Sequence, residues 1–556
     1  MIHRHRLNWR PILIALLVAA LIILQRDALR QWAYRITGEE NLFPQLRGLA
    51  QRASDLTRPP LTLRPETPIA HAGVNPFGIN TFLEQEVEPA KREQQLQLIS
   101  AAGFRWIRQE FPWYDIEIHA KNDFEDRRFE PHRSAWDKYD NIVDLAEQNN
   151  IQIVARLSAP PNWSRATGDS EGPFAPPDDY NDFADFAYAV ASRYAGRVNH
   201  FQIWNEPNIY PEWGDNPVNP EEYVDLLCRG YHAIKRANPD AVVLAGAIAP
   251  TASLTQRDMN DFIFLERMYA AGFANCYDIM SVQGYGLWSG PTDTRLRPVV
   301  INYARNQFIR DIMVRHGEAH KAIWISEMNW NAVPPDSGIP PNFGQVTLDQ
   351  QARFAPQAYQ RAESEWPWVG VVFFWFFKRA SDAEVNQPFY YFRMADPDFT
   401  LMPVYHSMAD YANQPPVLYR GYHQEDHWAL TYDDNWAIFP RADAVLGQIA
   451  IGAPGATLTF TVDGGALYLV TPTPGTTITL QLADQPPRTL ALTSETTLLS
   501  QLPPGPTPVT LTVGNTPLTL DALIVRPPNP FAPFWPLAAL TLALLALYAI
   551  FRPHPS

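Results

Sequence analysis

Short apolar runs alternate with segments of helical periodicity between residues 74 and 377. The runs are continuously apolar, which is typical of strands in a parallel sheet that is covered on both faces. They are VNPFGINTF (74–82), FRWIRQEF (104–111), IQIVARLSAP (151–160), VNHFQIWNEPN (198–208), AVVLAGAIAP (241–250), YDIMSVQGYG (277–286), AIWISEMNW (322–330) and WVGVVFFWFF (368–377). Eight such units predict an α/β fold, a (β/α)8 TIM barrel over residues 71–415. An open doubly wound sheet is the alternative, but no Gly-rich phosphate loop follows the first run.

The pattern changes from about residue 417, where apolar and polar residues alternate between Gly and Pro turns. The segments GATLTFTVDGGALYLVT, TTITLQLAD and TPVTLTVG show this period of two. It predicts a small antiparallel β-sandwich over residues 416–527. Residues 31–70 are polar and end in RPPLTLRPETP, so we interpret them as a stalk.

Two apolar stretches at the chain ends predict N- and C-terminal transmembrane helices. Residues 11–24 form an uncharged run of 14 after three arginines, and residues 1–30 are interpreted as an uncleaved signal anchor. A cleaved signal peptide is the alternative. Residues 531–551 are 21 residues without a charge, within a C-terminal helix and tail assigned to 528–556. Basic residues at both chain ends predict cytoplasmic termini, so the barrel is expected outside the cytoplasm, tethered to the cell membrane.

Charge and cysteine content narrow the function further. The formal net charge of −15 gives a nucleic-acid or anionic-lipid partner no electrostatic support, and no nucleic-acid partner is expected. The two cysteines, Cys228 and Cys276, make no disulfide framework, so we interpret them as buried free thiols. No histidine or cysteine cluster has metal-ligand spacing, and we expect neither a metal nor another cofactor. The chain is rich in aromatic residues, which suit a core and also stack on sugar rings.

Two glutamates lie at the ends of opposite predicted strands. Glu206, in FQIWNEPN, ends the fourth strand, and Glu327, in WISEMNW, ends the seventh. The carboxyl ends of barrel strands surround the active site, so the two carboxylates are expected to face each other across the mouth. Glycoside hydrolysis requires such a pair, because one group protonates the leaving oxygen and the other attacks or activates water. A glutamate that merely caps the following helix is the alternative for Glu206.

The motifs around these glutamates resemble those of clan A glycoside hydrolases, particularly family 39 and family 5 relatives. The resemblance covers roughly residues 74–412 and rests on WIRQEFPWYDIE, FQIWNEPN, KAIWISEMNW and MADPDFTLMPVYHSMADY. It implies a retaining mechanism, with Glu206 as the acid/base and Glu327 as the nucleophile. It also implies that Asn205 binds a sugar hydroxyl, that Arg108 braces the nucleophile and that Tyr285 lies beside it. The chain departs from the pattern at strand six, where QGY replaces the histidine-x-tyrosine of many members.

Further residues are candidates for substrate binding. Trp113, Trp163 and Trp375 fall at or just beyond the ends of three predicted strands, where their rings are predicted to bind sugars. Arg108 would be a costly buried cation without a partner, and either Glu327 or Glu110 is a candidate for that partner.

The sequence therefore predicts a membrane-anchored retaining glycosidase that acts on an extracytoplasmic poly- or oligosaccharide, in which the linkage is expected to be β. The alternative function is a non-catalytic polysaccharide-binding or assembly protein on the same barrel.

Overall fold

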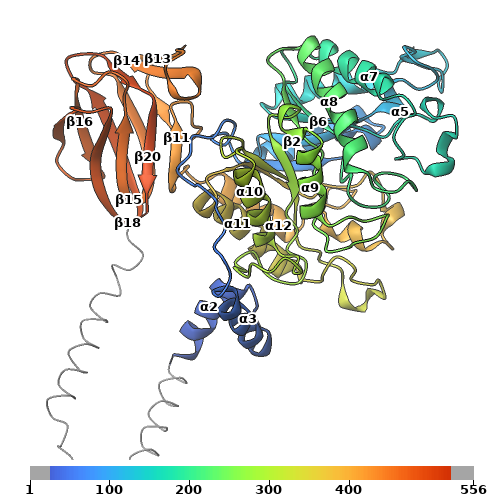
Figure 1. Ribbon diagram of the computed structural model, residues 1–556, viewed down its shortest axis with the longest axis horizontal. Coiled ribbons are helices and arrows are strands. Elements are labelled where there is room, and N and C mark those ends of the chain that lie inside the picture. The colour runs from blue at the N-terminus through green and yellow to red at the C-terminus, as the bar shows by residue number, and fades with distance from the viewer. Residues whose placement is uncertain (1–24, 528–556) are drawn as a thin grey trace, which may run out of the picture. The chain divides into compact units, whose positions relative to one another are not determined.

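The computed structural model describes residues 25–527 of the chain (Figure 1). The described residues form two compact units, the first of which contains residues 25–64, 76–362 and 369–414. The second unit contains residues 65–75, 363–368 and 415–527. The predicted spans at 11–24 and 531–551 lie outside the described residues. Between residues 25 and 527, no helix combines the length and the apolar character needed to cross a bilayer.

The first unit is built on an eight-stranded parallel sheet whose spatial order is β7-β6-β5-β2-β1-β10-β9-β8. Two parallel bridges, Leu244 with Ile279 and Ile248 with Val282, join β7 to β8 and close the sheet into a barrel. The strands are β1 (Phe77–Thr81), β2 (Trp106–Pro112), β5 (Gln152–Ser158), β6 (His200–Ile203), β7 (Val242–Leu244), β8 (Met280–Gln283), β9 (Ile323–Met328) and β10 (Val369–Phe374). Seven of these strands fall inside one predicted apolar run each, and β2 extends a single residue beyond its run, so the predicted barrel is confirmed.

Helices follow the strands in turn and surround the barrel (Figure 1). They are α4 (Pro89–Ala101), α6 (Asp137–Gln148), α7 (Tyr180–Arg193), α8 (Pro220–Ala237), α9 (Asp261–Ala270), α10 (Asn306–Arg315), α11 (Leu348–Glu365) and α12 (Pro403–Ala412).

The local sequence determines where helix α8 begins. Asn219 caps α8 by accepting hydrogen bonds from the backbone N–H groups of Glu221 and Glu222, and Pro220 occupies the first turn.

The barrel interior changes from apolar to polar along the strands. Trp106 packs edge-on against Trp324 with ring centroids 5.0 Å apart, and His200 stacks on Trp324 at 5.2 Å. Alternate strand residues point to the same face, so the next inward positions are Arg108 on β2 and Gln202 on β6. The aromatic layer thus closes the amino-terminal end of the barrel, and the polar layer above it begins the candidate site.

Residues 31–70 differ from the predicted stalk. Helices α2 (Arg26–Thr37) and α3 (Leu42–Asp55) form a hairpin that packs on the loop after β8. The backbone N–H of Gly290 donates to the carbonyl of Gly38 at 2.8 Å, and Arg295 forms an ion pair with Glu39 at 3.0 Å. The polar composition that indicated a stalk reflects these contacts with the barrel.

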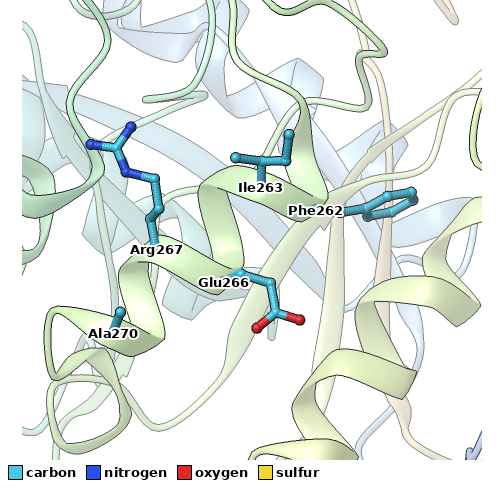
Figure 2. Close-up of a pocket in the computed structure, with 5 residues that line it drawn as sticks. All are labelled: Phe262, Ile263, Glu266, Arg267 and Ala270. Carbon is cyan, nitrogen blue, oxygen red and sulfur yellow. The ribbon is translucent and has the colours of Figure 1, made fainter.

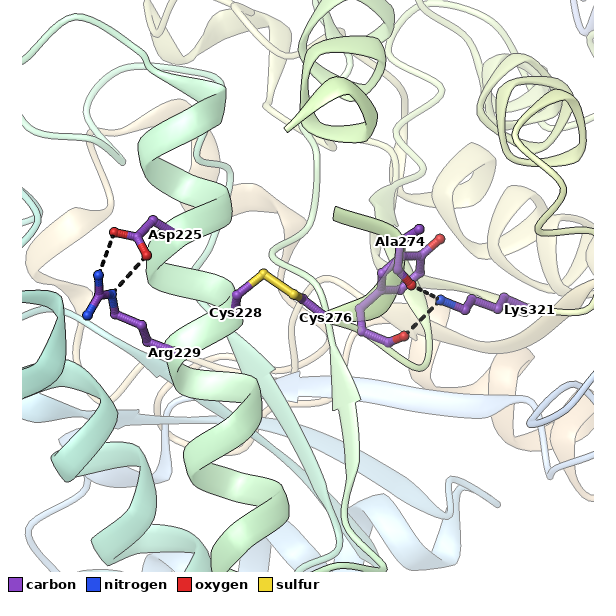
Figure 3. The surroundings of a disulfide bond; sticks show 7 residues. Asp225, Cys228, Arg229, Ala274, Cys276 and Lys321 are labelled. Atoms are coloured by element: carbon purple, nitrogen blue, oxygen red, sulfur yellow. Dashed lines mark hydrogen bonds and ion pairs between the residues drawn. A yellow bond between two sulfur atoms is a disulfide. The ribbon is translucent and has the colours of Figure 1, made fainter. Parts of the chain in front are cut away.

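Cys228 and Cys276 form a disulfide, so the prediction of free thiols is wrong. Cys228 lies on α8, and Cys276 lies 48 residues later, just before β8 (Figure 3). Their Cα atoms are 4.9 Å apart because α8 packs beside the segment that leads into β8. Two cysteines this far apart in sequence carry no spacing signal, so only the fold brings them together.

The second unit is antiparallel β structure, as its alternating pattern predicts. A seven-stranded sheet contains β11 (Gly421–Gln424), β12 (Thr431–Tyr432), β15 (Thr457–Val470), β16 (Thr477–Leu482), β17 (Arg488–Ala491), β18 (Thr496–Val513) and β20 (Ala522–Arg526). A three-stranded sheet contains β13 (Trp436–Pro440), β14 (Gln448–Gly452) and β19 (Leu518–Leu520). Leu458 and Leu467 of the larger sheet and Leu520 of the smaller belong to one buried apolar cluster. The two sheets therefore share a core.

Candidate active site

The end of β6 turns sharply into the mouth of the barrel. Trp204 and Glu206 have φ angles of 73° and 32°, in the left-handed region that residues other than glycine seldom adopt. The indole N–H of Trp204 donates to the carbonyl of Glu212 at 2.7 Å, and the side chain of Asn208 bonds to Ala249 beyond β7. These contacts anchor the turn, so the motif that ends β6 holds Asn205 and Glu206 at the carboxyl end of the barrel.

A β-bulge directs Glu327 inward. Val282 of β8 pairs with Ile325, and the next residue, Gln283, pairs with Glu327, so β9 carries one extra residue at Ser326. Without the bulge, strict alternation would send Ser326 and Glu327 to opposite faces. With it, the hydroxyl of Ser326 contacts Gln202 inside the barrel at 3.0 Å, and Glu327 also points inward.

Arg108 connects β2, β6 and β9 at the centre of the site. Its guanidinium donates to Glu327 at 2.8 Å and to Asn205 at 2.6 Å. It also donates to Asn80 at 2.9 Å and to Gln202 at 2.6 Å. Of the two candidate partners, Glu327 is therefore the one that Arg108 binds. Glu110 instead pairs with Arg156 at 2.5 Å.

Tyr285 holds the second oxygen of Glu327. Its hydroxyl donates to that carboxylate at 2.6 Å. Burial raises the pKa of Tyr285 well above its usual value, and the charges of Glu327 and Glu206 raise it further, so the phenol keeps the proton that it donates. A guanidinium and a phenol together fix the orientation of the Glu327 side chain.

Glu206 has a different electrostatic environment. Burial raises the pKa of Glu206 well above the usual range, and the nearby charges of Glu327 and Glu212 raise it further. The Gln283 amide and the Arg108 cation act in the opposite direction, and more weakly. A carboxyl group with a raised pKa keeps its proton to higher pH than an ordinary glutamate and is better able to donate it. Glu206 is thus suited to donate a proton. Glu327 is instead held by two hydrogen-bond donors, Arg108 and Tyr285.

Three functional candidates at the mouth, Glu84, Glu212 and Gln283, were not predicted from the sequence. Glu84, after β1, and Glu212, after β6, both have pKa values raised to about 7, chiefly by burial. The pKa of Glu212 also responds to the charge of Arg156 and to the Asn205 amide, which lower it. Gln283 is 2% exposed, and its amide acts on the pKa of Glu206 although neither polar atom of its side chain meets the geometry of a hydrogen bond within residues 25–527. The only sign of Gln283 in the sequence was its place in the QGY motif. In the barrel this residue pairs with Glu327 of the neighbouring strand.

The three candidate tryptophans occupy different environments. Trp113 is fully buried, its ring is stacked on Phe186 at 5.4 Å, and its indole N–H donates to Glu117 at 2.6 Å. It begins the short helix α5 (Trp113–Ile116) and offers no free face to a sugar, so its predicted role in substrate binding is wrong. Trp163 and Trp375 are half-buried, and their roles as sugar platforms stay predictions.

Metal ligands and surface pockets are two other places to look for a functional site in the part of the chain that the structure describes. No group of three histidine, cysteine, aspartate or glutamate side chains between residues 25 and 527 is arranged to hold a metal ion. A shallow depression lies on the outer face of α9, where Glu266 and Arg267 are among its lining residues (Figure 2). Glu266 pairs with Arg315, and Arg267 pairs with Glu221, so both charges already have partners.

Comparison with known proteins returns carbohydrate-active enzymes. No protein-family model matches the chain. Over 121 residues the chain is 32% identical to a β-xylosidase of Geobacillus stearothermophilus. The aligned segment covers 20% of this chain and 23% of that protein. The chain thus matches less than a quarter of the length of that relative.

Solved structures of similar fold include a family 39 glycoside hydrolase from Bacteroides cellulosilyticus WH2, at 17% identity and a TM-score of 0.47 over 83% of each chain. They also include a monomeric β-xylosidase from Caulobacter crescentus CB15, at 14% identity and a TM-score of 0.45, covering 82% of this chain and 98% of that one. Further neighbours belong to glycoside hydrolase families 30 and 5. These matches, like the sequence motifs, are to glycoside hydrolases.

Proposed function

We propose that the chain is a retaining glycoside hydrolase in which Glu327 is the nucleophile and Glu206 is the general acid and base. The observation that carries this proposal is the contrast between the two carboxyl groups. Glu327 is held by Arg108 and Tyr285, whereas the pKa of Glu206 is raised by burial and by the charge of Glu327. Two carboxyl groups with separated proton affinities are the usual requirement of this chemistry.

The mechanism follows from these roles. A carboxylate oxygen of Glu327 attacks the anomeric carbon while Glu206 gives its proton to the departing glycosidic oxygen, so one C–O bond forms as another breaks. Glu206 then removes a proton from water, whose oxygen attacks the same carbon and releases Glu327. Asn205, which is held by Arg108, lies next to Glu206 and is placed to bind a sugar hydroxyl beside the reacting bond. The two carboxyl groups are expected to lie about 5–5.5 Å apart, the spacing of retaining enzymes.

The substrate that we propose is a β-linked glycan. The local similarity to a β-xylosidase supports β-xylosides as the first compounds to assay. Trp163 follows β5 and Trp375 follows β10, so half-buried rings on separate strands support a cleft that holds sugars on both sides of the cut, as an internally cleaving enzyme needs. The long loops 119–134 and 331–346 would instead wall off one end of the cleft in an enzyme that releases terminal sugars.

We also propose that the barrel works outside the cytoplasm, tethered to the cell membrane. The disulfide between Cys228 and Cys276 supports an oxidising compartment, because cytosolic thiols are normally kept reduced. The uncharged sequences at 11–24 and 531–551 support a tether at one or both ends of the chain.

Turnover by the full chain in detergent tests the catalytic proposal. Wild type is assayed on a panel of aryl β-glycosides and β-linked polysaccharides, beside Glu327→Gln, Glu206→Ala and the surface control Glu222→Gln. We expect Glu327→Gln to lose nearly all turnover, and Glu206→Ala to retain activity on aryl glycosides with good leaving groups and to gain more with azide. Equal rates for wild type and both site variants would contradict the proposal. Binding of a polysaccharide without any turnover would favour the non-catalytic alternative.

A further inference from the structure

The outer face of the α2–α3 hairpin carries an unusual concentration of exposed apolar side chains. Among the described residues 22 large hydrophobic side chains are exposed, and six of them lie between residues 29 and 56. They are Leu29, Trp32, Leu42, Phe43, Leu46 and Leu56. Phe43 is 83% exposed and Trp32 is 53% exposed. Scattered exposed apolar residues are ordinary, but a cluster in one short segment indicates a surface that meets another apolar phase.

The hairpin is firmly attached to the barrel by its other face. The hydroxyl of Tyr34 donates to Gln357 at 2.6 Å, and the hydroxyl of Thr292 donates to the carbonyl of Tyr34 at the same distance. Asp55 accepts from the backbone N–H of Leu296 at 3.0 Å, and Arg295 donates to Gln51 at 2.9 Å. The inner face is therefore polar and paired, and the apolar side chains are held outward.

From these contacts we infer that the outer face of α2–α3 rests on the surface of a phospholipid bilayer. Tryptophan and phenylalanine favour the interfacial region of a membrane, and arginine side chains extend from it to the headgroups. Residues 26–58 contain six arginines and four acidic residues, a net charge of 6 − 4 = +2, in a chain whose formal charge is −15. The positive charge of the hairpin thus favours contact with an anionic headgroup layer, which the net negative charge of the rest of the protein would repel.

The position of the hairpin in the chain supports the same occupant. Helix α2 begins at Arg26, directly after the uncharged apolar sequence 11–24. A segment that enters the bilayer there would bring α2 and α3 to its surface without further linker. This inference goes beyond glycoside hydrolysis and does not depend on it.

Contact with a membrane would orient the site. The hairpin packs on residues 290–296, in the loop that follows β8, the strand that carries Gln283. One side of the barrel mouth would then lie next to the bilayer. Substrate that reaches the mouth there would be a glycan held at the membrane surface.

The test measures lipid contact residue by residue in the full chain. Single cysteines replace Trp32, Phe43 or Tyr188, and each is labelled with an environment-sensitive fluorophore while the native disulfide stays closed. Tyr188 lies on α7, which follows the third barrel strand, whereas the hairpin contacts α11, which follows the seventh and opposite strand. It is an exposed aromatic residue and serves as the matched control.

The labelled chains are reconstituted in vesicles of phosphatidylcholine and phosphatidylglycerol, with and without brominated acyl chains. We expect the labels at residues 32 and 43 to shift to shorter emission wavelength and to be quenched by brominated lipid, and the label at residue 188 to show neither effect. Labels at 32 and 43 that stay as water-exposed as the control would overturn the inference. A shielded label that brominated lipid does not quench would also overturn it, because the occupant would then be protein, either a second copy or another chain.

Discussion

Glu206 and Glu327 reach the mouth of the barrel through two different departures from regular strand geometry. Glu206 follows a turn in which Trp204 has a positive φ, and Glu327 follows a bulge in β9. The sequence predicted both residues at the correct strand ends, because apolar runs mark the strands and their carboxyl ends face the site. It did not predict the bulge, because a one-residue shift in register leaves no mark in an apolar pattern.

The charge of Glu212 is expected to set the upper pH limit of activity. Glu212 helps to raise the pKa of Glu206, so Glu212→Gln should lower that pKa, and Glu206 should lose its proton at lower pH. The high-pH limb of kcat/KM should therefore move to lower pH, which a pH–rate profile measures. Glu222→Gln, on the exposed face of α8, is the control and should leave the limb in place. A high-pH limb that stays unchanged in Glu212→Gln would show that Glu212 does not act on the proton donor.

Trp113 and Trp375 should respond differently to the same truncation. Trp113→Ala removes a fully buried ring and should cost about 3–5 kcal/mol in the free energy of unfolding. Trp375→Ala should leave stability closer to wild type and raise KM, because that half-buried ring is proposed to face sugar. Chemical denaturation and steady-state kinetics separate the two effects. A Trp375→Ala variant with normal KM on every substrate would remove this residue from the binding site.

At the scale of elements, the disulfide joins two neighbouring β/α units. Cys228 on α8 and Cys276 before β8 close a loop with a sequence separation of 48 residues. Apolar periodicity placed both elements correctly but gave no information on which side chains meet between them. The same limit applies to the α2–α3 hairpin, whose polar sequence indicated a stalk although its inner face pairs with the barrel.

Opening the disulfide should destabilise the barrel. A cross-link over a loop of this size typically contributes about 2–4 kcal/mol, largely by restricting the unfolded chain. The double variant Cys228→Ala/Cys276→Ala should therefore unfold at lower denaturant concentration than the oxidised wild type. Reductant should lower the midpoint of the wild type and leave that of the variant unchanged. Identical midpoints for the oxidised wild type and the variant would contradict a structural role for the bond.

At the scale of the whole molecule, the proposed membrane tether predicts which side of the membrane the barrel occupies. If both cross the bilayer, the barrel lies outside the cytoplasm and both termini lie inside. Reporter fusions after residue 527 and after residue 556 should then report opposite sides. Reports from the same side would show that the second apolar sequence does not cross.

The central claim is that Glu327 forms a covalent bond to the sugar, and trapping that intermediate tests it most directly. The full chain is incubated with an activated 2-deoxy-2-fluoro aryl β-glycoside of the sugar that it hydrolyses, and its intact mass is measured. We predict the addition of one fluoroglycosyl group per chain, located by peptide mapping to Glu327 and absent from Glu327→Gln. Two results would contradict the assignment. One is steady turnover of the natural linkage with no adduct and with inversion at the anomeric carbon. The other is an adduct on Glu206 or Glu212.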